Sequence, residues 1–288
     1  MKPSPSKRLM RTIWLRLPRA GWTYKLAKLL TRSVLRPETT SLVRDVRFAG
    51  RFAMRLDLSD IVGNDLYCMD DHYEALSMAL WRSLAEGAET IVDLGSHIGL
   101  FACAAAAVNR HARVIAVEAF GPNVQLLRSN AAQFPNLTPV AVAIGVTSGS
   151  RTFRVSPITG GGYVEPDEPG RVSTPGTRDQ TGEGFVLDTI DLAELCTRES
   201  IGPIGLMKMD LEGLEEALLT GQKEFWARWS PQHVIVEITV SRSRREPERR
   251  MFAAMAERGY RCRRLEGLYT IPWFQAEDLA NWYFWKGS

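Results

Sequence analysis

Apolar runs that alternate between strand-like and helix-like spacing dominate the chain between residues 90 and 240. Five of these runs are short and rich in apolar residues, as is typical of buried strands. They lie at residues 90–95, 113–120, 137–145, 206–210 and 233–238. Helical spacing follows at residues 98–108, 121–134 and 214–221. This alternation predicts a doubly wound α/β sheet with mostly parallel strands.

Upstream of this region the pattern changes. Residues 46–58 show strand-like alternation that places Phe52, Met54, Leu56 and Leu58 on one face. Residues 70–87 have helical spacing and stop at a glycine, a common helix end. We therefore expect a strand-rich segment and a helix before the first strand of the sheet.

The C-terminal end and one long insertion complete the pattern. A helix is expected at residues 246–260, followed by short strands at 260–265 and 281–287. These two strands are expected to pair antiparallel and close the edge of the sheet. Residues 156–184 are rich in Gly, Pro and Thr, and loops of this length are commonly functional lids.

Composition describes an ordinary globular protein. The chain has 288 residues, of which 45% are hydrophobic and 24% charged, enough for one large core. Its four cysteines form no CxxC pair, which favours a reducing compartment and a cytoplasmic protein. The longest apolar run, residues 100–108, is far shorter than the roughly 20 residues that span a bilayer.

Positive charge is concentrated at the N-terminus. Residues 1–56 hold 14 Lys and Arg against Glu38 and Asp45, a balance of +12 in a chain of net charge +3. We divide the chain into a basic N-terminal arm, residues 1–45, and a domain, residues 46–288. The arm carries Trp, Tyr and Leu among its bases, so it either packs on the domain or lies peripherally on an anionic membrane surface. Nucleic acid is an unlikely partner because no binding motif accompanies the charge.

The first strand-to-helix turn, in VDLGSHIGL, has the features of a nucleotide-binding loop. Gly95 and Gly99 allow a tight turn at a helix N-terminus, and Glu118 ends the next strand 19 residues after Gly99. A carboxylate there can bind both hydroxyls of a ribose. The loop lacks the third glycine of the dinucleotide fingerprint, and Asp93 would repel a pyrophosphate. An acid suits an ammonium or sulfonium group, which favours S-adenosylmethionine (SAM) over NAD.

Further segments resemble the FkbM type of SAM-dependent methyltransferase. In chain order they are IVDLGSHIGLFA, VIAVEAFGPNVQLLRSN, VAIGVTSG, FVLDTIDLAEL, LMKMDLEGLEEALLTG and HVIVEI. Upstream, HYE at residues 72–74 resembles the aromatic–Glu pair that precedes the first motif of the family. The resemblance covers about residues 70–240, and the KxDxEGxE pattern from Lys208 to Glu215 is its most specific part.

The resemblance implies a Rossmann-like class I methyltransferase fold with an antiparallel edge strand, SAM as cofactor and transfer of a methyl group, usually to a hydroxyl. It implies cofactor contacts by Glu74, Asp93, Gly95, Ser96, His97, Gly99, Glu118 and Ala143. The chain departs from the family where His97 replaces the more usual Asn. It also lacks an acid in AIGVTSG, and Ile190 replaces Leu.

Acids also follow the fourth and fifth predicted strands. Asp210 and Glu237 end these strands, and neighbouring parallel strands would bring both to one crevice with Glu212. We assign these three as the catalytic group that binds or deprotonates the acceptor. A divalent cation is a less favoured use of the same acids, and Asp210 could instead cap a helix. Glu215 and Glu216 are expected to be acids of a first helical turn.

The expected activity is O-methylation of a hydroxyl on a small molecule or glycan. Arg242, Arg244 and Arg245 favour an anionic acceptor, although solvated surface arginines explain them equally well. The alternatives are an NAD(P)-dependent oxidoreductase on a similar sheet and a non-catalytic module anchored by the arm. His233 is a further candidate base, but a lone histidine at a strand start is more commonly structural.

Overall fold

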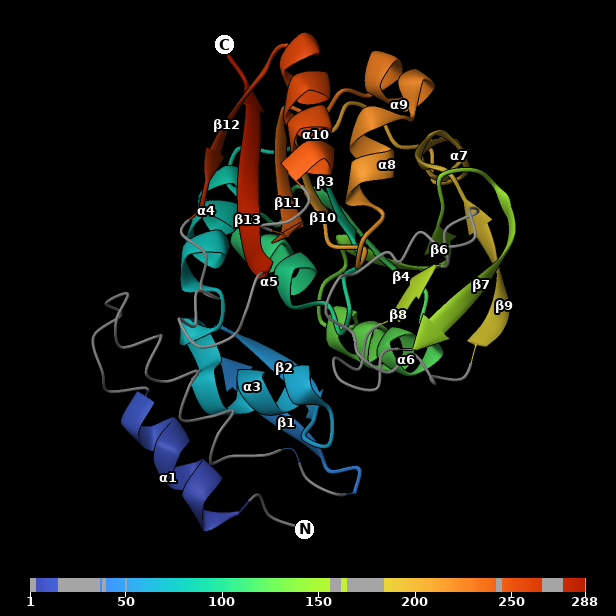
Figure 1. The fold of residues 1–288 in the computed structure, drawn as a ribbon. Coiled ribbons are helices and arrows are strands. Elements are labelled where there is room, and N and C mark those ends of the chain that lie inside the picture. The colour runs from blue at the N-terminus through green and yellow to red at the C-terminus, as the bar shows by residue number, and fades with distance from the viewer. Residues whose placement is uncertain are drawn as a thin grey trace.

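The computed structural model describes residues 4–14, 37, 40–49, 51–155, 162–164, 184–241, 245–265 and 277–287. Its centre is a seven-stranded sheet in the order β12-β13-β11-β10-β3-β4-β5 (Figure 1). From one edge to the other, these strands are Tyr260–Arg264, Glu277–Lys286, His233–Ser241, Leu206–Met209, Thr90–Leu94, Arg113–Glu118 and Leu137–Ala141. The strands from β5 to β11 are parallel, and β13 runs antiparallel to both its neighbours. The prediction of a mostly parallel sheet with an antiparallel strand at its end is confirmed.

Helices cover both faces of this sheet. One face packs against α4 (Ala75–Ala85), α5 (Leu100–Val108) and α6 (Gly121–Ala131). The other packs against α7 (Leu192–Arg198), α8 (Glu215–Thr220), α9 (Lys223–Arg228) and α10 (Arg245–Glu257). Alternate residues of each strand enter opposite cores: Ile91 faces α4 and α5, and Val92 faces the other layer. This two-sided burial explains why the parallel strands read as continuous apolar runs.

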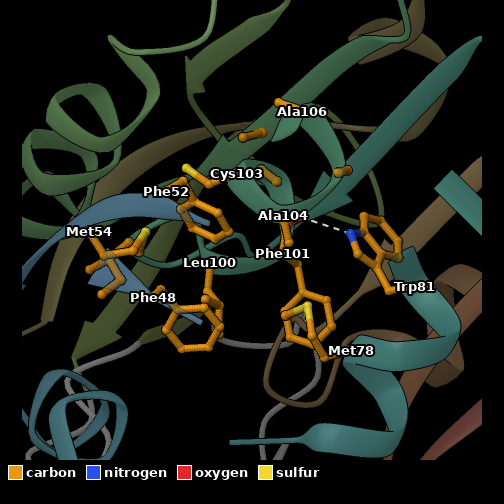
Figure 2. Packing of buried hydrophobic residues seen from close by; sticks show 14 of the residues in the cluster. Phe48, Phe52, Met54, Met78, Trp81, Leu100, Phe101, Cys103, Ala104 and Ala106 are labelled. Carbon is orange, nitrogen blue, oxygen red and sulfur yellow. Dashed lines mark hydrogen bonds between the residues drawn. The ribbon is translucent and has the colours of Figure 1, made fainter. Parts of the chain in front are cut away.

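Large aromatic side chains of α4 and α5 pack together in the core on this face of the sheet. Trp81 of α4 is fully buried and donates its indole N–H to the carbonyl of Phe101 over 2.8 Å. Its ring meets the ring of Phe101 edge-on, with centroids 5.8 Å apart. Figure 2 shows this packing, with Ala104 and Ala106 from the alanine-rich remainder of α5.

The region before the sheet forms a hairpin and two helical segments. Strands β1 (Val43–Phe48) and β2 (Phe52–Asp57) pair antiparallel and are followed by α3 (Ile61–Met69) and the 3-10 turn η1 (Asp70–His72). Phe52, Met54, Leu56 and Leu58 are all buried, as their alternation predicted. Strand β1 begins at Val43, within residues assigned to the arm.

Two expected elements have different bounds. The helix expected at residues 70–87 was placed too early, because Glu74 adopts a left-handed conformation (φ 45°) that separates η1 from α4. The strand expected at 137–145 divides into β5 and β6 (Ala143–Ile144), which belong to different sheets. No periodicity in the sequence reveals the break between β5 and β6, since the residues on both sides remain apolar.

A smaller sheet that the sequence reading missed has the order β6-β9-β7-β8. Its other strands are β7 (Gly149–Val155), β8 (Gly162–Val164) and β9 (Gly184–Ile190). It lies beside the main sheet, next to α7 (Figure 1). Within the loop expected at residues 156–184, the structure describes only β8 and Gly184, where β9 begins. The rest of this loop lies outside the described residues.

The described helix of the basic arm is α1 (Pro5–Trp14), which contacts α3 and η1. Arg11 forms an ion pair with the buried Asp70 over 2.7 Å and donates to the carbonyl of Tyr67 over 2.6 Å. This contact agrees with an arm that packs on the domain. Within the described residues, none of the helices is long and apolar enough to cross a membrane.

Candidate active site

The chemistry-bearing residues converge at the carboxyl edge of the main sheet. Lys208 on β10 lies opposite Asp93 on β3, and the neighbouring strand β11 carries Glu237 just beyond the matched pair Met209 and Val236. Side chains at alternate positions share a face, so the charged groups continue the face covered by α4 and α5. Strands β10 and β11 are parallel neighbours with Met209 opposite Val236, so Asp210 and Glu237 follow this pair at the same edge, as predicted.

The glycine loop is packed against the end of β10. The N–H groups of Gly95 and Ser96 both donate to the carbonyl of Val117, over 3.0 and 2.9 Å. Gly95 has φ +73°, and a Cβ there would lie 1.8 Å from the backbone oxygen of Asp210. Only glycine fits this conformation and this approach. The loop and the acids after β10 therefore form one continuous edge.

Glu118 shapes the same loop. One carboxylate oxygen accepts from the N–H groups of Ala119 and Phe120, and the other accepts from the N–H of His97, over distances of 2.8 to 2.9 Å. A carboxylate has about four acceptor positions, so capacity remains for a ribose hydroxyl. The described geometry thus gives Glu118 an organising role that sequence reasoning missed, and its ribose contact stays a prediction.

Other residues expected at the cofactor have distinct environments. Ser96 is buried and donates its hydroxyl to the carbonyl of Val117, and Ala143 is buried at the start of β6. His97 has φ 52°, and both of its ring nitrogens are buried with no partner among the described residues. One carboxylate oxygen of Asp93 accepts from Ala102, and the other is equally unpartnered.

Lys208 is the buried cation of the site. Its ammonium donates to Asp210 over 2.6 Å and lies 4.8 Å from the ring centroid of Phe101. Burial alone would lower the pKa of Lys208, but Asp210 and the other surrounding carboxylates outweigh burial and raise it. Burial raises the pKa of Asp93 to about 7 against the attraction of Lys208. The lysine therefore stays charged and holds Asp210 in place.

The loop between β10 and α8 is held by Glu215. Its two carboxylate oxygens accept from the N–H groups of Leu211 and Gly213, over 2.6 and 2.9 Å. Glu215 thus does more than complement the helix dipole, and Asp210 makes no cap because no side-chain bond caps α8. The clamped loop keeps Glu212 in a left-handed conformation (φ 53°). Burial, followed by the charges of Asp210 and Glu215, raises the pKa of Glu212 to about 7.

Comparison with known proteins identifies this arrangement. A profile described as the methyltransferase FkbM domain matches residues 93–262, more than half of the chain. The chain belongs to the FkbM family of SAM-dependent methyltransferases. The family match favours methyl transfer over the oxidoreductase alternative. No curated protein matches the chain.

Solved structures similar to this FkbM methyltransferase are distant. Fibrillarin from Aeropyrum pernix, with natively bound S-adenosyl-L-methionine, has 13% identity and a TM-score of 0.45, with 73% of this chain and 74% of that chain covered. An O-methyltransferase from Bacillus cereus in complex with SAH has 13% identity and a TM-score of 0.41, with 72% and 81% covered.

The residues of this FkbM methyltransferase fit the cofactor of its family. The unpartnered oxygen of Asp93 and the ring nitrogens of His97 need hydrogen-bonding partners that the described chain does not supply. SAM carries an ammonium group and a sulfonium charge, which suit a carboxylate such as Asp93, and ribose hydroxyls and other polar atoms, which suit Glu118 and the ring nitrogens of His97. Among the described residues, no three His, Cys, Asp or Glu side chains are arranged to hold a metal ion.

Asn281 and Ser77, which sequence reasoning missed, lie on the β13 side of the site. Asn281 of β13 lies opposite Glu237 and donates to Glu74 over 3.2 Å and to Ser77 over 3.0 Å. The predicted cofactor residue Glu74 is therefore placed beside β13. The signal for Asn281 was a polar residue within an aromatic strand, but only the strand pairing relates it to Glu237.

The remaining histidine candidate has a structural environment. His233 begins β11, four residues before Glu237 on the same strand, and its Nδ1 is 2.8 Å from the hydroxyl of Tyr283. The two rings stack with centroids 5.8 Å apart. His233 is thus too far along the strand to act on the acids of the site.

Proposed function

We propose that this protein transfers the methyl group of SAM to a hydroxyl of a small molecule or glycan. The observation that carries the proposal is the contact between the Gly95 loop and Asp210, which joins a cofactor-type loop to a row of acids. A hydroxyl needs to lose a proton during methylation, and a carboxylate within hydrogen-bonding reach can take it.

On the cofactor side, Glu118 would bind the ribose, and Asp93 and His97 would bind the remaining polar groups. When bound, SAM supplies an electrophilic methyl group. The protein then gains most of its rate by aligning that methyl group with the acceptor oxygen. Burial of Asp93 and the packed loop limit the movement of groups on this side.

On the acceptor side, Asp210, Glu212 and Glu237 would bind and deprotonate the hydroxyl. Lys208 holds Asp210 at 2.6 Å, which orients that carboxylate. Burial and neighbouring acids raise the pKa of Glu237 well above its ordinary value, and raise that of Glu212 to about 7. A base with a pKa near the working pH is effective at accepting a proton, so Glu212 is the first candidate base.

Calorimetry with S-adenosylhomocysteine tests the cofactor site. We expect wild-type protein to bind it with micromolar affinity and Glu118→Ala to lose at least about tenfold of that affinity, equivalent to ~1.4 kcal/mol. Glu86→Ala removes an exposed acid at the end of α4 and should bind like wild type. No binding to folded wild-type protein would refute the proposal.

Peripheral membrane contact is the second proposal and concerns α1. Leu9 and Ile13 are exposed on this helix, at 61% and 41%, and Arg8 is exposed beside them. Such a helix can bury apolar side chains in an anionic lipid surface. We expect co-sedimentation with anionic but not neutral vesicles, and weaker binding of the double variant Leu9→Ser, Ile13→Ser. Equal sedimentation of wild type and variant would contradict the proposal.

A further inference from the structure

The carboxyl groups around Lys208 carry more negative charge than this one lysine balances. Five carboxyl groups surround one lysine, and the same cation, Lys208, acts on Asp93, Glu212 and Glu237. The full set around Lys208 is Glu74, Asp93, Asp210, Glu212 and Glu237. Lys208 is already bonded to Asp210, so Asp93, Glu212 and Glu237 share a positive charge that is already paired.

Glu237 lies away from Glu118, the predicted ribose ligand. Glu118 ends β4, and the order β11-β10-β3-β4 puts Glu237 three strands from it. Neighbouring strands are about 4.8 Å apart, so the separation across the sheet is roughly 14 Å. Glu237 and its neighbours therefore face the acceptor side of the edge.

Asn281, opposite Glu237, has a side-chain oxygen that lacks a hydrogen-bond donor among the described residues. Its amide nitrogen donates to both Glu74 and Ser77, which settles which way the amide points. Its amide oxygen has no partner among the described residues, and it cannot bond freely to solvent because Asn281 is only 5% exposed. Buried polar atoms in proteins are nearly always paired, so this oxygen is suited to a donor from a ligand.

We propose that the acceptor carries a protonated amine beside the hydroxyl that is methylated, and that Glu237, Glu74 and Asn281 bind this amine. An ammonium group supplies three donors and one positive charge, which two carboxylates and an amide oxygen complement. Asp210 and Glu212 remain for the hydroxyl. This inference rests on the proposed function and narrows its substrate class to amino alcohols, including amino sugars.

Of the three arginines that suggested an anionic acceptor, Arg242 and Arg244 lie outside the described part of the chain, and Arg245 begins α10. Within the described site, an anion would meet Glu74 and Glu237 at close range. The raised pKa of Glu237 agrees with a missing counter-charge, which an ammonium group would provide while a proton is released to solvent.

The test uses full-length protein saturated with S-adenosylhomocysteine. Three small probes of similar size, each with a hydroxyl, are titrated by ligand-observed NMR: 2-aminoethanol, ethylene glycol and glycolate. We expect 2-aminoethanol to bind about tenfold more tightly than ethylene glycol, and glycolate to bind most weakly. Calorimetry in buffers of different ionisation enthalpy should show proton release with 2-aminoethanol alone.

Variants assign the binding to named groups. Glu237→Gln, which preserves size, and Asn281→Ala should both weaken 2-aminoethanol binding about fivefold or more and leave the affinity for S-adenosylhomocysteine unchanged. Asp45→Asn is the control, because it removes an exposed charge on the distant hairpin. A melting curve establishes whether each variant is folded. If Asn281→Ala does not fold, Glu237→Gln alone decides the test.

The outcomes separate this inference from the proposed function. Loss of S-adenosylhomocysteine binding by wild type would defeat the methyltransferase proposal itself. If S-adenosylhomocysteine binds but the three probes bind equally, or 2-aminoethanol does not bind, only the proposal that the acceptor carries an amine is overturned. A weaker affinity of Asn281→Ala for S-adenosylhomocysteine would assign Glu74 and Asn281 to the ammonium of the cofactor and also overturn the inference.

Discussion

At the scale of single residues, His97 combines a strained backbone with an unsatisfied side chain. Its left-handed φ of 52° is uncommon for a residue other than glycine or asparagine. The asparagine more usual in the family tolerates that conformation better, so histidine here is retained at a conformational cost. Its two unpartnered ring nitrogens suggest that the ring contributes to ligand binding.

Substitution of His97 separates these two effects. We expect His97→Leu to weaken S-adenosylhomocysteine binding about tenfold, because a hydrogen bond of roughly 1 kcal/mol or more is lost. His97→Asn should keep most of the affinity, since an amide can bond to the same ligand and suits the backbone. His111→Leu, at an exposed loop histidine, is the matched control. Equal affinity of His97→Leu and wild type would remove His97 from the cofactor site.

Glu212 makes stability depend on pH. Its pKa rises from an ordinary 4.5 to about 7 in the folded protein, chiefly through burial. The folded state therefore holds this proton more tightly than the unfolded state, and the resulting stabilisation is complete below pH ~4.5 and lost as pH rises through ~7. In wild type the unfolding free energy should decrease as pH rises from about 4.5 to about 7. We expect this decrease to be about 1 to 3 kcal/mol smaller in Glu212→Gln, after allowance for the partial exposure of Glu212.

Urea unfolding at several pH values measures this effect. Asp93 and Glu237 have pKa shifts in the same direction, so wild-type stability should decrease with pH even in the variant. A pH dependence identical in Glu212→Gln and wild type would show that Glu212 titrates normally.

At the scale of elements, the turn after β3 and the end of β10 depend on each other. The N–H of Asp210 donates to the carbonyl of Leu94 over 3.1 Å, and Gly95 lies against the Asp210 carbonyl. This contact crosses more than 100 residues of sequence. It explains why the cofactor loop and the acid motif have to be considered as one structural unit.

Gly95→Ala should disrupt that unit. A Cβ at 1.8 Å from a backbone oxygen forces the loop away from β10, and φ +73° adds strain. We expect a loss of about 2 to 4 kcal/mol in unfolding free energy, together with loss of S-adenosylhomocysteine binding. Gly87→Ala is the control, because nothing lies within 4 Å of its Cβ position and the change should be within about 0.5 kcal/mol. Similar melting temperatures for the two variants would contradict the close contact.

At the scale of the whole molecule, Arg11 connects the N-terminal arm to the domain. It pairs with Asp70, which is buried, while Ala49 donates its N–H to the same carboxylate over 2.6 Å. Burial raises the pKa of Asp70, and the charge of Arg11 opposes that rise. The ion pair thus allows a buried acid to remain charged between α1 and η1.

Arg11→Ala should therefore destabilise the protein by about 2 to 3 kcal/mol, because Asp70 keeps its burial and loses its partner. The double variant Arg11→Ala, Asp70→Asn should recover part of this loss. Arg55→Ala breaks an exposed ion pair with Asp45 and should cost less than about 1 kcal/mol. Thermal unfolding compares the three, and equal effects of Arg11→Ala and Arg55→Ala would contradict a buried anchor.

Much of this architecture could be predicted from local patterns. The strands β3, β4, β10 and β11 and the helices between them follow from apolar runs, since burial on both faces selects continuous apolar sequence. Gly95, Asp93 and Glu118 were found because a nucleotide loop requires particular residue types at particular spacings. The approach of Asp210 to Glu237 followed from the rule that neighbouring parallel strands bring their carboxyl ends together, although β11 continues past Glu237 to Ser241 and does not end there as expected.

The tertiary structure alone decided what depends on contacts between distant segments. Asn281 joins Glu74 across 207 residues, and β6 leaves the main sheet to pair with β9. The roles of Glu118 and Glu215 as acceptors for backbone N–H groups also depend on the exact course of the loops. A sequence pattern reports which face of an element is buried, whereas hydrogen bonds and electrostatic fields depend on which elements become neighbours, and that is determined only when the chain packs.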